Sequence, residues 1–204
     1  MENFKAFNLP LALNEALEYL RFEKPTPIQA EAIPHALAGR DILGSAQTGT
    51  GKTGAFGIPL IAQLLKNQLG SALVMTPTRE LAVQVIDMIE LMLGMDSGIK
   101  TALLIGGESM GRQLNQLKSK PRLIVGTPGR INDHLQRRTL KLDDTNFLVL
   151  DETDRMLDMG FSVQIDRIIA HLPKQRQTLL FSATLPANIV KLSARYLNVP
   201  IRVS

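Results

Sequence analysis

The regular alternation of short apolar runs with amphipathic segments restricts the fold of this chain more than any other feature of its sequence. Most runs are apolar at every position, as in strands that are buried on both faces of a parallel sheet. Between two of them, Leu81–Leu93 repeats apolar residues every three or four positions, which is typical of a helix packed on a sheet. The pattern therefore predicts an α/β fold with a doubly wound, mostly parallel sheet. Six strands are expected: Asp41–Ser45, Ala72–Thr76, Thr101–Ile105, Leu123–Gly126, Phe147–Leu150 and Thr178–Phe181.

Composition excludes several classes of protein. The 204 residues carry a net charge of +4 and have the apolar and charged content of an ordinary globular domain. Cysteine is absent, which excludes disulfides, thiolate metal sites and cysteine nucleophiles, and the histidines are too scattered to predict a metal site. No apolar run approaches the roughly 20 residues of a membrane helix, and the N-terminus does not have the pattern of a signal sequence. We therefore expect a cytoplasmic protein without a membrane partner.

The first forty residues differ from the rest because they contain helical patterns but no predicted strand. Leu11–Leu20 is amphipathic, and Thr26 followed by Pro27 is a good start for a second helix that reaches about Leu37. No linker rich in Gly, Ser or Pro separates this segment from the remainder. We therefore predict that residues 1–40 form a helical extension packed on the main domain, residues 41–204.

A glycine-rich loop follows the first predicted strand and precedes a helical pattern. In a phosphate-binding loop, glycines let backbone N–H groups turn inward, a lysine reaches the outer phosphates, and a Ser or Thr hydroxyl binds magnesium. Ala46 stands where the general pattern has its first glycine, so the match is to a variant, and the alternative is a plain strand-to-helix turn. The strand–loop–helix context favours a phosphate site made of Gln47, Thr48, Gly49, Thr50, Gly51, Lys52 and Thr53.

A nucleotide site of this kind also needs an acidic residue at the end of another buried strand. Phe147–Leu150 is followed by Asp151 and Glu152, so Asp151 is a candidate to hold magnesium, through water, together with Thr53. Glu152 is a candidate to orient or deprotonate the attacking water. Alone, such acids commonly begin a helix, where they suit the positive end of the helix dipole. The combination with Lys52 favours the catalytic and metal-binding interpretation.

These motifs resemble those of the first RecA-like domain of the DEAD-box ATP-dependent RNA helicases, and they occur in the order of that family over essentially the whole chain. The resemblance implies a RecA-like P-loop NTPase fold that binds ATP and Mg²⁺. The segment from Phe22 to Gln29 resembles the Q motif of the family, with Phe4 as its upstream aromatic residue. By that resemblance, Phe22 stacks on adenine and Gln29 hydrogen-bonds its edge, for which an amide has both a donor and an acceptor.

Three further loops resemble the family motifs that bind the RNA backbone. Each follows a predicted strand directly, and each alone would be an ordinary turn or a surface charge. Hydroxyl groups, helix N-termini and arginine are suitable donors to phosphate, and such contacts carry no base information. The resemblance therefore implies RNA binding that is mostly independent of sequence and sensitive to salt. The residues are Pro77, Thr78, Arg79, Gly106, Gly107, Thr127, Pro128, Gly129 and Arg130.

The segment Ser182-Ala183-Thr184 resembles the family motif that couples the acidic motif to the RNA side. The hydroxyl groups of Ser182 and Thr184 are expected to reach neighbouring carboxylates such as Asp151 and Asp154. The simpler alternative is a strand-to-helix cap. A coupling role for Asp154, Ser182 and Thr184 therefore rests on the resemblance.

Two positions depart from the family pattern. Thr153 stands where the acidic motif of the family has alanine, which adds a hydroxyl group and a branch at Cβ but leaves the three acids intact. Arg21 stands where the family has glycine before Phe22. Because glycine adopts positive φ readily and arginine does not, this change is expected to alter the turn at the adenine pocket.

Two groups of basic residues lie outside these motifs, one from Lys118 to Arg122 and one from Arg137 to Lys141. A solvated face is the favoured interpretation, since exposed Lys and Arg are the norm. An extension of the RNA-binding surface is the alternative.

The resemblance predicts the N-terminal half of an ATP-dependent RNA helicase, with the second RecA-like domain absent from this chain. With that domain, ATP hydrolysis would be stimulated by RNA and coupled to local unwinding of a duplex, whereas the isolated domain is expected to be weakly active or inactive. One alternative is a small-molecule phosphotransferase, for which the sequence offers neither an acceptor pocket nor a lid. The other is a module that binds nucleotide or a partner without turnover.

Overall fold

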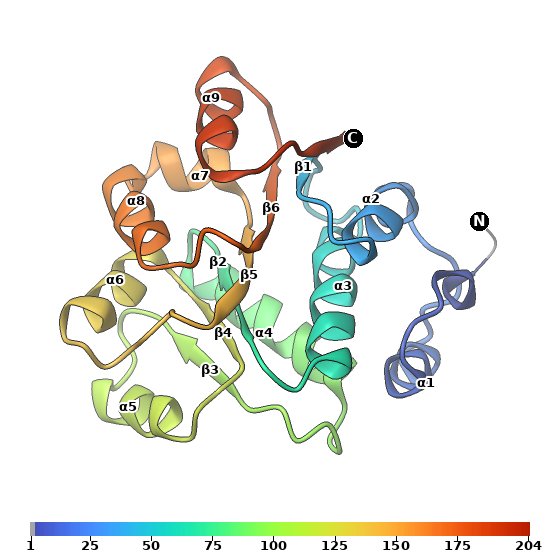
Figure 1. The fold of residues 1–204 in the computed structure, drawn as a ribbon, viewed down its shortest axis with the longest axis horizontal. Coiled ribbons are helices and arrows are strands. Elements are labelled where there is room, and N and C mark those ends of the chain that lie inside the picture. The colour runs from blue at the N-terminus through green and yellow to red at the C-terminus, as the bar shows by residue number, and fades with distance from the viewer. Residues whose placement is uncertain (1–2) are drawn as a thin grey trace.

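Seven parallel strands form one sheet at the centre of the structure, a computed structural model that describes residues 3–204 (Figure 1). The sequence pattern predicts the first six to within two residues at each end, but it does not predict the seventh. That strand is only three residues long, and its middle residue, Arg202, is exposed at the edge of the sheet, so it carries no buried apolar run. The strands are β1 Ile42–Ser45, β2 Ser71–Met75, β3 Thr101–Leu104, β4 Leu123–Gly126, β5 Thr145–Leu150, β6 Gln177–Ser182 and β7 Ile201–Val203.

Helices cover both faces of the sheet, as Figure 1 shows for α3 and α4 on one side and α6 and α8 on the other. Each of the first six strands leads into a connection that contains at least one helix, which is the pattern of a doubly wound fold. Within residues 3–204, no helix is both long and apolar enough to cross a membrane. The helices are α1 Leu11–Tyr19, α2 Pro27–Leu37, α3 Lys52–Lys66, α4 Arg79–Leu93, α5 Met110–Lys118, α6 Pro128–Gln136, α7 Thr153–Asp158, α8 Ser162–Ala170 and α9 Ala187–Tyr196, after a short 3₁₀ turn at Phe4–Phe7.

The strands lie side by side in the order β3-β4-β2-β5-β6-β1-β7. This order places the ends of β3, β4 and β2 next to one another in one half of the sheet. The ends of β5, β6 and β1 are neighbours in the other half. Because every pair is parallel, the carboxyl ends of all the strands meet at one edge, where ligands bind in folds of this type.

One apolar core lies on each face of the sheet, between the strands and the helices that cover them. Within β2, Ala72 and Val74 join the core beneath α1 to α4, and Leu73 and Met75 join the core beneath the opposite helices. The alternation of side chains along a strand explains this division, and burial on both faces explains why the strands are apolar throughout. Each core contains more than twenty buried apolar side chains, which is ample to hold the carboxyl edge rigid.

The N-terminal segment packs on the first of these cores. Leu13 and Leu17 of α1 are completely buried there, and Ile33 of α2 is buried in the same cluster. The helix α2 begins with a capping box, in which Thr26 and Gln29 hydrogen-bond each other's backbone N–H groups. The segment is therefore fixed against α3, with which α2 makes its main contact.

Asp41 fastens the edge of the sheet beside β1. One of its carboxylate oxygens accepts a hydrogen bond from the backbone N–H of Thr178 at 2.9 Å. The other accepts one from the backbone N–H of Asn198 at 2.6 Å. Its backbone carbonyl also accepts from Ile201, the first residue of β7, at 2.8 Å. One buried side chain thus connects three segments that lie far apart in the sequence.

We predict that Asp41→Asn lowers the free energy of unfolding by about 2 kcal/mol, the usual size of a hydrogen bond to a charged group. The new amide nitrogen would face a backbone N–H donor and leave it without an acceptor. Urea denaturation measures the change. The matched control is Asp158→Asn, at an exposed residue, which we expect to change stability by no more than about 0.5 kcal/mol. Equal midpoints and slopes for the two variants would contradict the prediction.

Candidate functional site

The loop between β1 and α3 has a backbone suited to an anion. Gly49 and Gly51 have φ values of +83° and +84°, a backbone region that residues with a Cβ rarely adopt. The hydroxyl of Thr50 donates to the carbonyl of Gln47 at 2.6 Å and closes the loop. Gly51 is the N-cap of α3, so the first N–H groups of the helix have no partner within it. Together with the helix dipole, these groups favour phosphate.

The side chain of Lys52, the first residue of α3, lies between two carboxylates at the end of β5. Its Nζ is 2.8 Å from Asp151 Oδ1 and 3.5 Å from Glu152 Oε2, and all three side chains are largely buried. Neither of those oxygens has a well-aligned hydrogen-bond donor among residues 3–204, so we treat both contacts as ion pairs. Burial raises the pKa of Asp151, while the Lys52 ammonium acts in the opposite direction. The cluster is held together by charge.

The backbone of Glu152 is strained. Its φ and ψ are +51° and +52°, the left-handed region, which costs a residue with a Cβ about 1 kcal/mol or more. The residue is the N-cap of α7 and makes the sharp turn from β5 into that helix. This turn keeps its carboxylate next to Lys52 while Asp151 remains in line with the strand. Strain of this kind is found where the surrounding structure needs one particular orientation.

A cavity of about 310 Å³ brings most of the predicted nucleotide residues together, although Gln47 and Thr50 of the phosphate loop do not line it. Its lining includes Phe22 and Gln29 from the N-terminal segment, the phosphate loop, and the acids at the end of β5. The volume is within the range of small-molecule sites. The sequence does not predict the wall that α4 contributes, because those residues look like ordinary positions on an amphipathic helix. They are Leu81, Gln84, Val85 and Met88.

Gln29 connects the N-terminal segment to the phosphate loop. Its Nε2 donates to the carbonyl of Gly51 at 3.0 Å, and its Oε1 accepts from the N–H of Thr26 at 3.0 Å. Since one partner can only accept and the other can only donate, the orientation of the amide is fixed. A Cβ at Gly51 would lie 2.7 Å from Gln29 Nε2, and one at Gly54 would lie 2.6 Å from it, so both glycines permit this close approach. The adenine contact predicted for Gln29 remains a prediction.

The residues around Lys52 fit a magnesium ion that is shared with a bound phosphate. Among residues 3–204, no group of three or more His, Cys, Asp or Glu side chains forms a cation cage, so the protein alone offers too few ligands for one. Magnesium is commonly held by one or two carboxylates, substrate phosphates and waters. Thr53 and Asp151 line the same cavity, and the buried carboxylate of Asp151 is paired with the ammonium of Lys52. This donor set suits such a site.

The three loops predicted to bind RNA follow β2, β3 and β4, so they are neighbours at one half of the carboxyl edge. The guanidinium of Arg79 lies against Gly107, where a Cβ would overlap it, so these two loops touch directly. Arg130 uses one nitrogen, Nη1, to donate to the carbonyl of Glu108 at 3.4 Å and to Gln113 Oε1 at 3.2 Å. These contacts connect all three loops into one surface.

The motif after β6 makes one of its two predicted contacts. Thr184 Oγ1 donates to Asp154 Oδ2 at 3.2 Å, as expected. The prediction for Ser182 is wrong in this structure, because its hydroxyl is buried without a hydrogen-bond partner among residues 3–204. Ser182 is the last residue of β6, is paired with Ser45 and is completely buried, whereas Asp154 is only half-buried. A coupling role for these residues stays a prediction.

The two departures from the resemblance are accommodated differently. The hydroxyl of Thr153 is buried and lies 3.1 Å from the carbonyl of Phe181 and 3.3 Å from that of Leu150. It therefore bridges the ends of β6 and β5. Arg21 adopts φ +62°, so arginine takes up the positive φ that the turn requires, at the cost of local strain. The expectation that Arg21 alters the turn at the adenine pocket stays a prediction.

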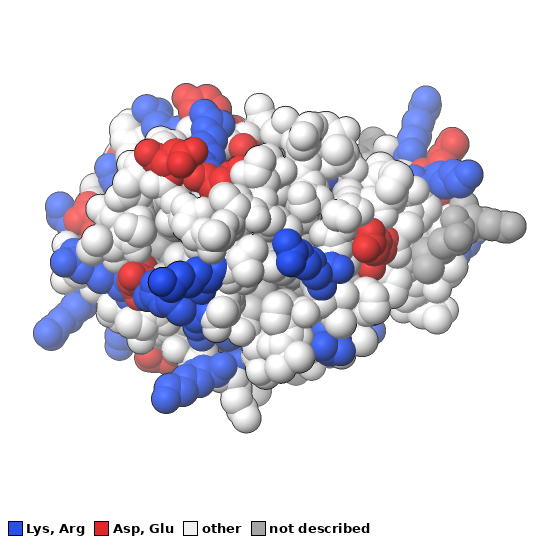
Figure 2. Space-filling view, turned by 90° about the horizontal axis from the view of Figure 1, so that it is seen from above, with Lys and Arg blue, Asp and Glu red and all other residues white. Residues whose placement is uncertain are grey.

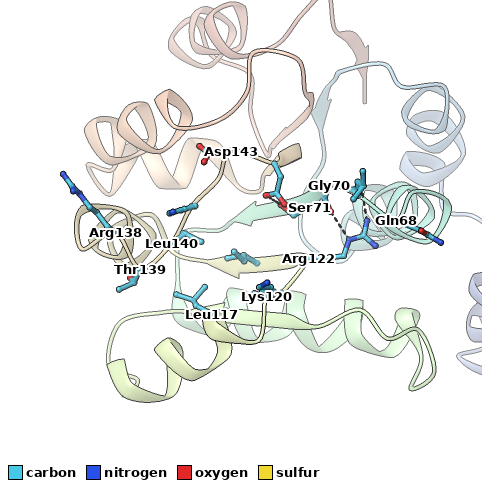
Figure 3. A pocket seen from close by; sticks show the side chains of 15 residues that line it. Gln68, Gly70, Ser71, Leu117, Lys120, Arg122, Arg138, Thr139, Leu140 and Asp143 are labelled. Carbon is cyan, nitrogen blue, oxygen red and sulfur yellow. Dashed lines mark hydrogen bonds between the residues drawn. The ribbon is translucent and has the colours of Figure 1, made fainter.

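The two basic groups outside the motifs meet at the opposite edge of the sheet. They line a cavity of about 540 Å³ beside the first residues of β2 and β4 (Figure 3). Arg122 points toward Gly70 and donates to its carbonyl at 2.9 Å and to that of Leu64 at 3.0 Å, whereas Arg138 points away into solvent. Arg122 thus has a structural role. Because this edge is remote from the three loops, these residues do not extend the predicted RNA surface.

Charge is dispersed over the face seen in Figure 2. Lys and Arg stand there in small groups separated by uncharged surface, with Asp and Glu among them. This face carries no continuous basic field, so the net charge of +4 does not by itself mark a binding surface. The predicted RNA contacts depend on the local geometry of the loops.

Comparison with known proteins agrees with this geometry. The model of the DEAD/DEAH box helicase family matches residues 26–192. The chain belongs to this family. The DEAD-box ATP-dependent RNA helicase CshA of Bacillus subtilis is 46% identical over 201 residues, which cover 98% of this chain and 40% of that protein. The ATP-dependent RNA helicase CshA of Listeria monocytogenes is also 46% identical, over 98% of this chain and 38% of its own length.

A solved DEAD-box protein confirms the RecA-like fold. The crystal structure of a DEAD box protein from the hyperthermophile Methanococcus jannaschii superposes with a TM-score of 0.94 at 41% identity. The match covers 100% of this chain and 56% of that one. This DEAD-box chain thus spans about two fifths of the curated relatives that it matches, and it corresponds to their N-terminal portion.

We predict that Thr153→Ala, which restores the alanine of the family pattern, lowers the free energy of unfolding by about 1 kcal/mol, the net value of a hydrogen bond. The change removes the bridge between β5 and β6 but leaves the charge cluster at Lys52 intact. Thermal or urea unfolding measures the loss. Thr153→Ser is the matched control, since it keeps the hydroxyl and is expected to retain most of the stability. An alanine variant as stable as the wild type would show that the bridge contributes nothing.

Proposed function

We propose that this chain is the ATP- and RNA-binding half of an ATP-dependent RNA helicase. In the proposal it acts with a second RecA-like domain to couple ATP hydrolysis to local unwinding of an RNA duplex. The observation that carries the proposal is the placement of Lys52 between Asp151 and Glu152, beside a glycine-rich anion loop. Membership of the DEAD/DEAH box helicase family supports it, as does the similarity to the two CshA proteins, which are ATP-dependent RNA helicases.

The nucleotide would enter the cavity beside the phosphate loop. Phe22 would stack on the base, and the second N–H of Gln29 would be available to its edge. The N–H groups at the start of α3 would surround the phosphates, and Lys52 would exchange a carboxylate for phosphate oxygen. Thr53 and Asp151 would hold magnesium, which neutralises phosphate charge when it is bound. Freed from Lys52, the carboxylate of Glu152 would accept a hydrogen bond from water and orient it for attack.

The three loops after β2, β3 and β4 would bind one strand of RNA through its sugar-phosphate backbone. Donors suited to phosphate are the guanidinium groups of Arg79 and Arg130, the hydroxyl of Thr78, and the N-terminus of α6 behind Thr127. The glycines Gly106, Gly107 and Gly129 would allow close approach of the strand. The hydrogen bond between Thr184 and Asp154 would link the motif after β6 to the acidic motif.

The decisive experiment measures ATP hydrolysis with and without single-stranded RNA. We predict weak or no activity for this chain alone, and RNA-stimulated activity when it is joined to the C-terminal portion of a relative such as CshA. If the fusion binds nucleotide but never hydrolyses it, the alternative of a binding module without turnover is correct. Hydrolysis that RNA does not affect, together with phosphorylation of a small acceptor, would instead indicate a phosphotransferase.

We predict that Glu152→Gln in the fusion lowers turnover at least a hundredfold while ATP binding stays within about threefold, because the amide cannot accept a proton from water. Rapid-mixing hydrolysis and fluorescence titration with a labelled nucleotide measure the two quantities. The control is Glu108→Gln, an acidic residue outside the nucleotide cavity, which should leave nucleotide binding unchanged. A Glu152 variant with wild-type turnover would remove this residue from the mechanism.

A further inference from the structure

Two buried polar residues lie behind the loops that we propose bind RNA. Gln113 of α5 is 1% exposed, and His134 of α6 is completely buried. Each lies on the helix that follows one of those loops, since α5 follows Gly106-Gly107 and α6 begins at Pro128. A buried polar side chain is costly unless its hydrogen bonds are satisfied, so such a pair calls for an explanation.

Gln113 is the centre of a hydrogen-bonded network. Its Nε2 donates to the carbonyl of Ile105 at 2.8 Å, at the start of the first loop. Its Oε1 accepts from Arg130 Nη1 at 3.2 Å and from His134 Nε2 at 2.7 Å. The same Arg130 nitrogen donates to the carbonyl of Glu108 at 3.4 Å. The network therefore spans both loops.

The chemistry of the partners fixes the state of His134. Arg130 can only donate, so the oxygen of the Gln113 amide must face it, and His134 Nε2 must then carry a hydrogen. The other ring nitrogen, Nδ1, lies 2.7 Å from the hydroxyl of Thr139, which can donate to it. Burial, and after it the charge of Arg130, lowers the pKa of His134, so the neutral ring is favoured. Thr139 Oγ1 also lies 3.1 Å from the His134 carbonyl and has a single hydrogen, so the neutral Nε2–H form of the ring requires that hydrogen to point to Nδ1.

The network also determines how Arg130 is presented. Only Nη1 is hydrogen-bonded within residues 3–204, and both lone pairs of Gln113 Oε1 are used, one by Arg130 and one by His134. The remaining N–H groups of the guanidinium stay available to phosphate. Loss of the His134 donor would remove one of the three hydrogen bonds of the Gln113 side chain, so the amide oxygen that faces Arg130 would be held less firmly. Neither Gln113 nor His134 lies in a predicted motif.

We propose that Gln113 and His134 are positioning residues that hold Gly106–Glu108 and Thr127–Arg130 as one rigid surface for the RNA backbone. The inference rests on the proposed RNA-binding function and adds two residues to it. Neither residue touches RNA or nucleotide. Their effect on RNA is transmitted through Arg130 and the carbonyl groups of the first loop.

The test compares His134→Phe, which keeps the volume of the ring but removes the donor, with His134→Gln, whose Nε2 restores it. We expect His134→Phe to weaken binding of a short fluorescein-labelled oligouridylate about tenfold, a factor that corresponds to about 1.4 kcal/mol. Affinity for a fluorescent ADP analogue should stay within about twofold. His134→Gln should recover most of the RNA affinity. In His134→Phe, the amide groups of 105–108 and 127–131 should exchange hydrogen faster, and those of the phosphate loop should not.

A control separates positioning from a general loss of stability. Ile189→Val removes a buried methyl group in α9, far from the network, and should affect RNA and nucleotide binding equally little. RNA affinity unchanged in His134→Phe would overturn the inference, as would an equal loss of RNA and nucleotide affinity. Failure of the wild-type chain and its fusion to bind RNA at all would overturn the proposed function itself, and this inference with it. If His134→Phe does not fold, Gln113→Leu is the substitute, and the same selective loss of RNA affinity is required of it.

Discussion

The hydrogen-bond ladder between parallel strands is the constraint on which the whole site depends. It ends β2, β4, β5 and β1 at the same edge, and it continues for one residue beyond each of them. The N–H of Asp151 donates to the carbonyl of Met75 at 2.9 Å, and that of Ala46 donates to the carbonyl of Ser182 at 3.0 Å. The loops that follow these strands therefore start at the same edge of the sheet, although their residues are far apart in the sequence. The order of strands then decides which loops become neighbours, so the nucleotide residues gather in one half of the edge and the proposed RNA residues in the other.

Electrostatic interactions determine how the side chains are arranged in the half of the edge that we propose binds nucleotide. An isolated buried carboxylate would lose several kcal/mol of hydration, and two adjacent ones would also repel each other. Lys52 relieves both effects because it lies between them, but it can do so only if Glu152 turns back toward it from the end of β5. The left-handed backbone of Glu152 is the cost of that turn, and the well-packed ends of β5 and α7 support it. The same residue lines the cavity beside the loop, so a phosphate bound there would compete directly with the carboxylates for the ammonium.

The pattern of the sequence was sufficient for the fold and for most of the residues that meet at the cavity proposed to bind nucleotide. Strands buried on both faces have an unmistakable composition, and a phosphate loop needs glycine and lysine at fixed spacing. The pattern was not sufficient for β7, which is short and lies at an edge, or for the wall formed by Gln84 and Met88. It also missed Asp41, Gln113 and His134, because nothing in their neighbourhood in the sequence indicates that they will be buried against partners from other elements. The contact predicted for Ser182 was wrong for the same reason, since the direction of its hydroxyl depends on the packing of β6.

The strand order also limits how the two halves of the edge can influence each other. β5 lies between β2, which leads to Arg79, and β6, which leads to Thr184. Within the sheet, a rearrangement at the motif after β6 would reach the loops that we propose bind RNA through β5, and the contact between α8 and α6 offers a second route. The connections are already present on both sides of that strand: Thr153 and Asp154 contact the β6 side, and the N–H of Asp151 is bonded to Met75 on the β2 side. Since Asp151 also holds Lys52, a phosphate that draws Lys52 away changes the charge balance at the one strand that touches both halves. The acidic motif thus offers one route from the proposed nucleotide site to the loops that we propose bind RNA, and α4, which lines the same cavity and begins at Arg79, offers another.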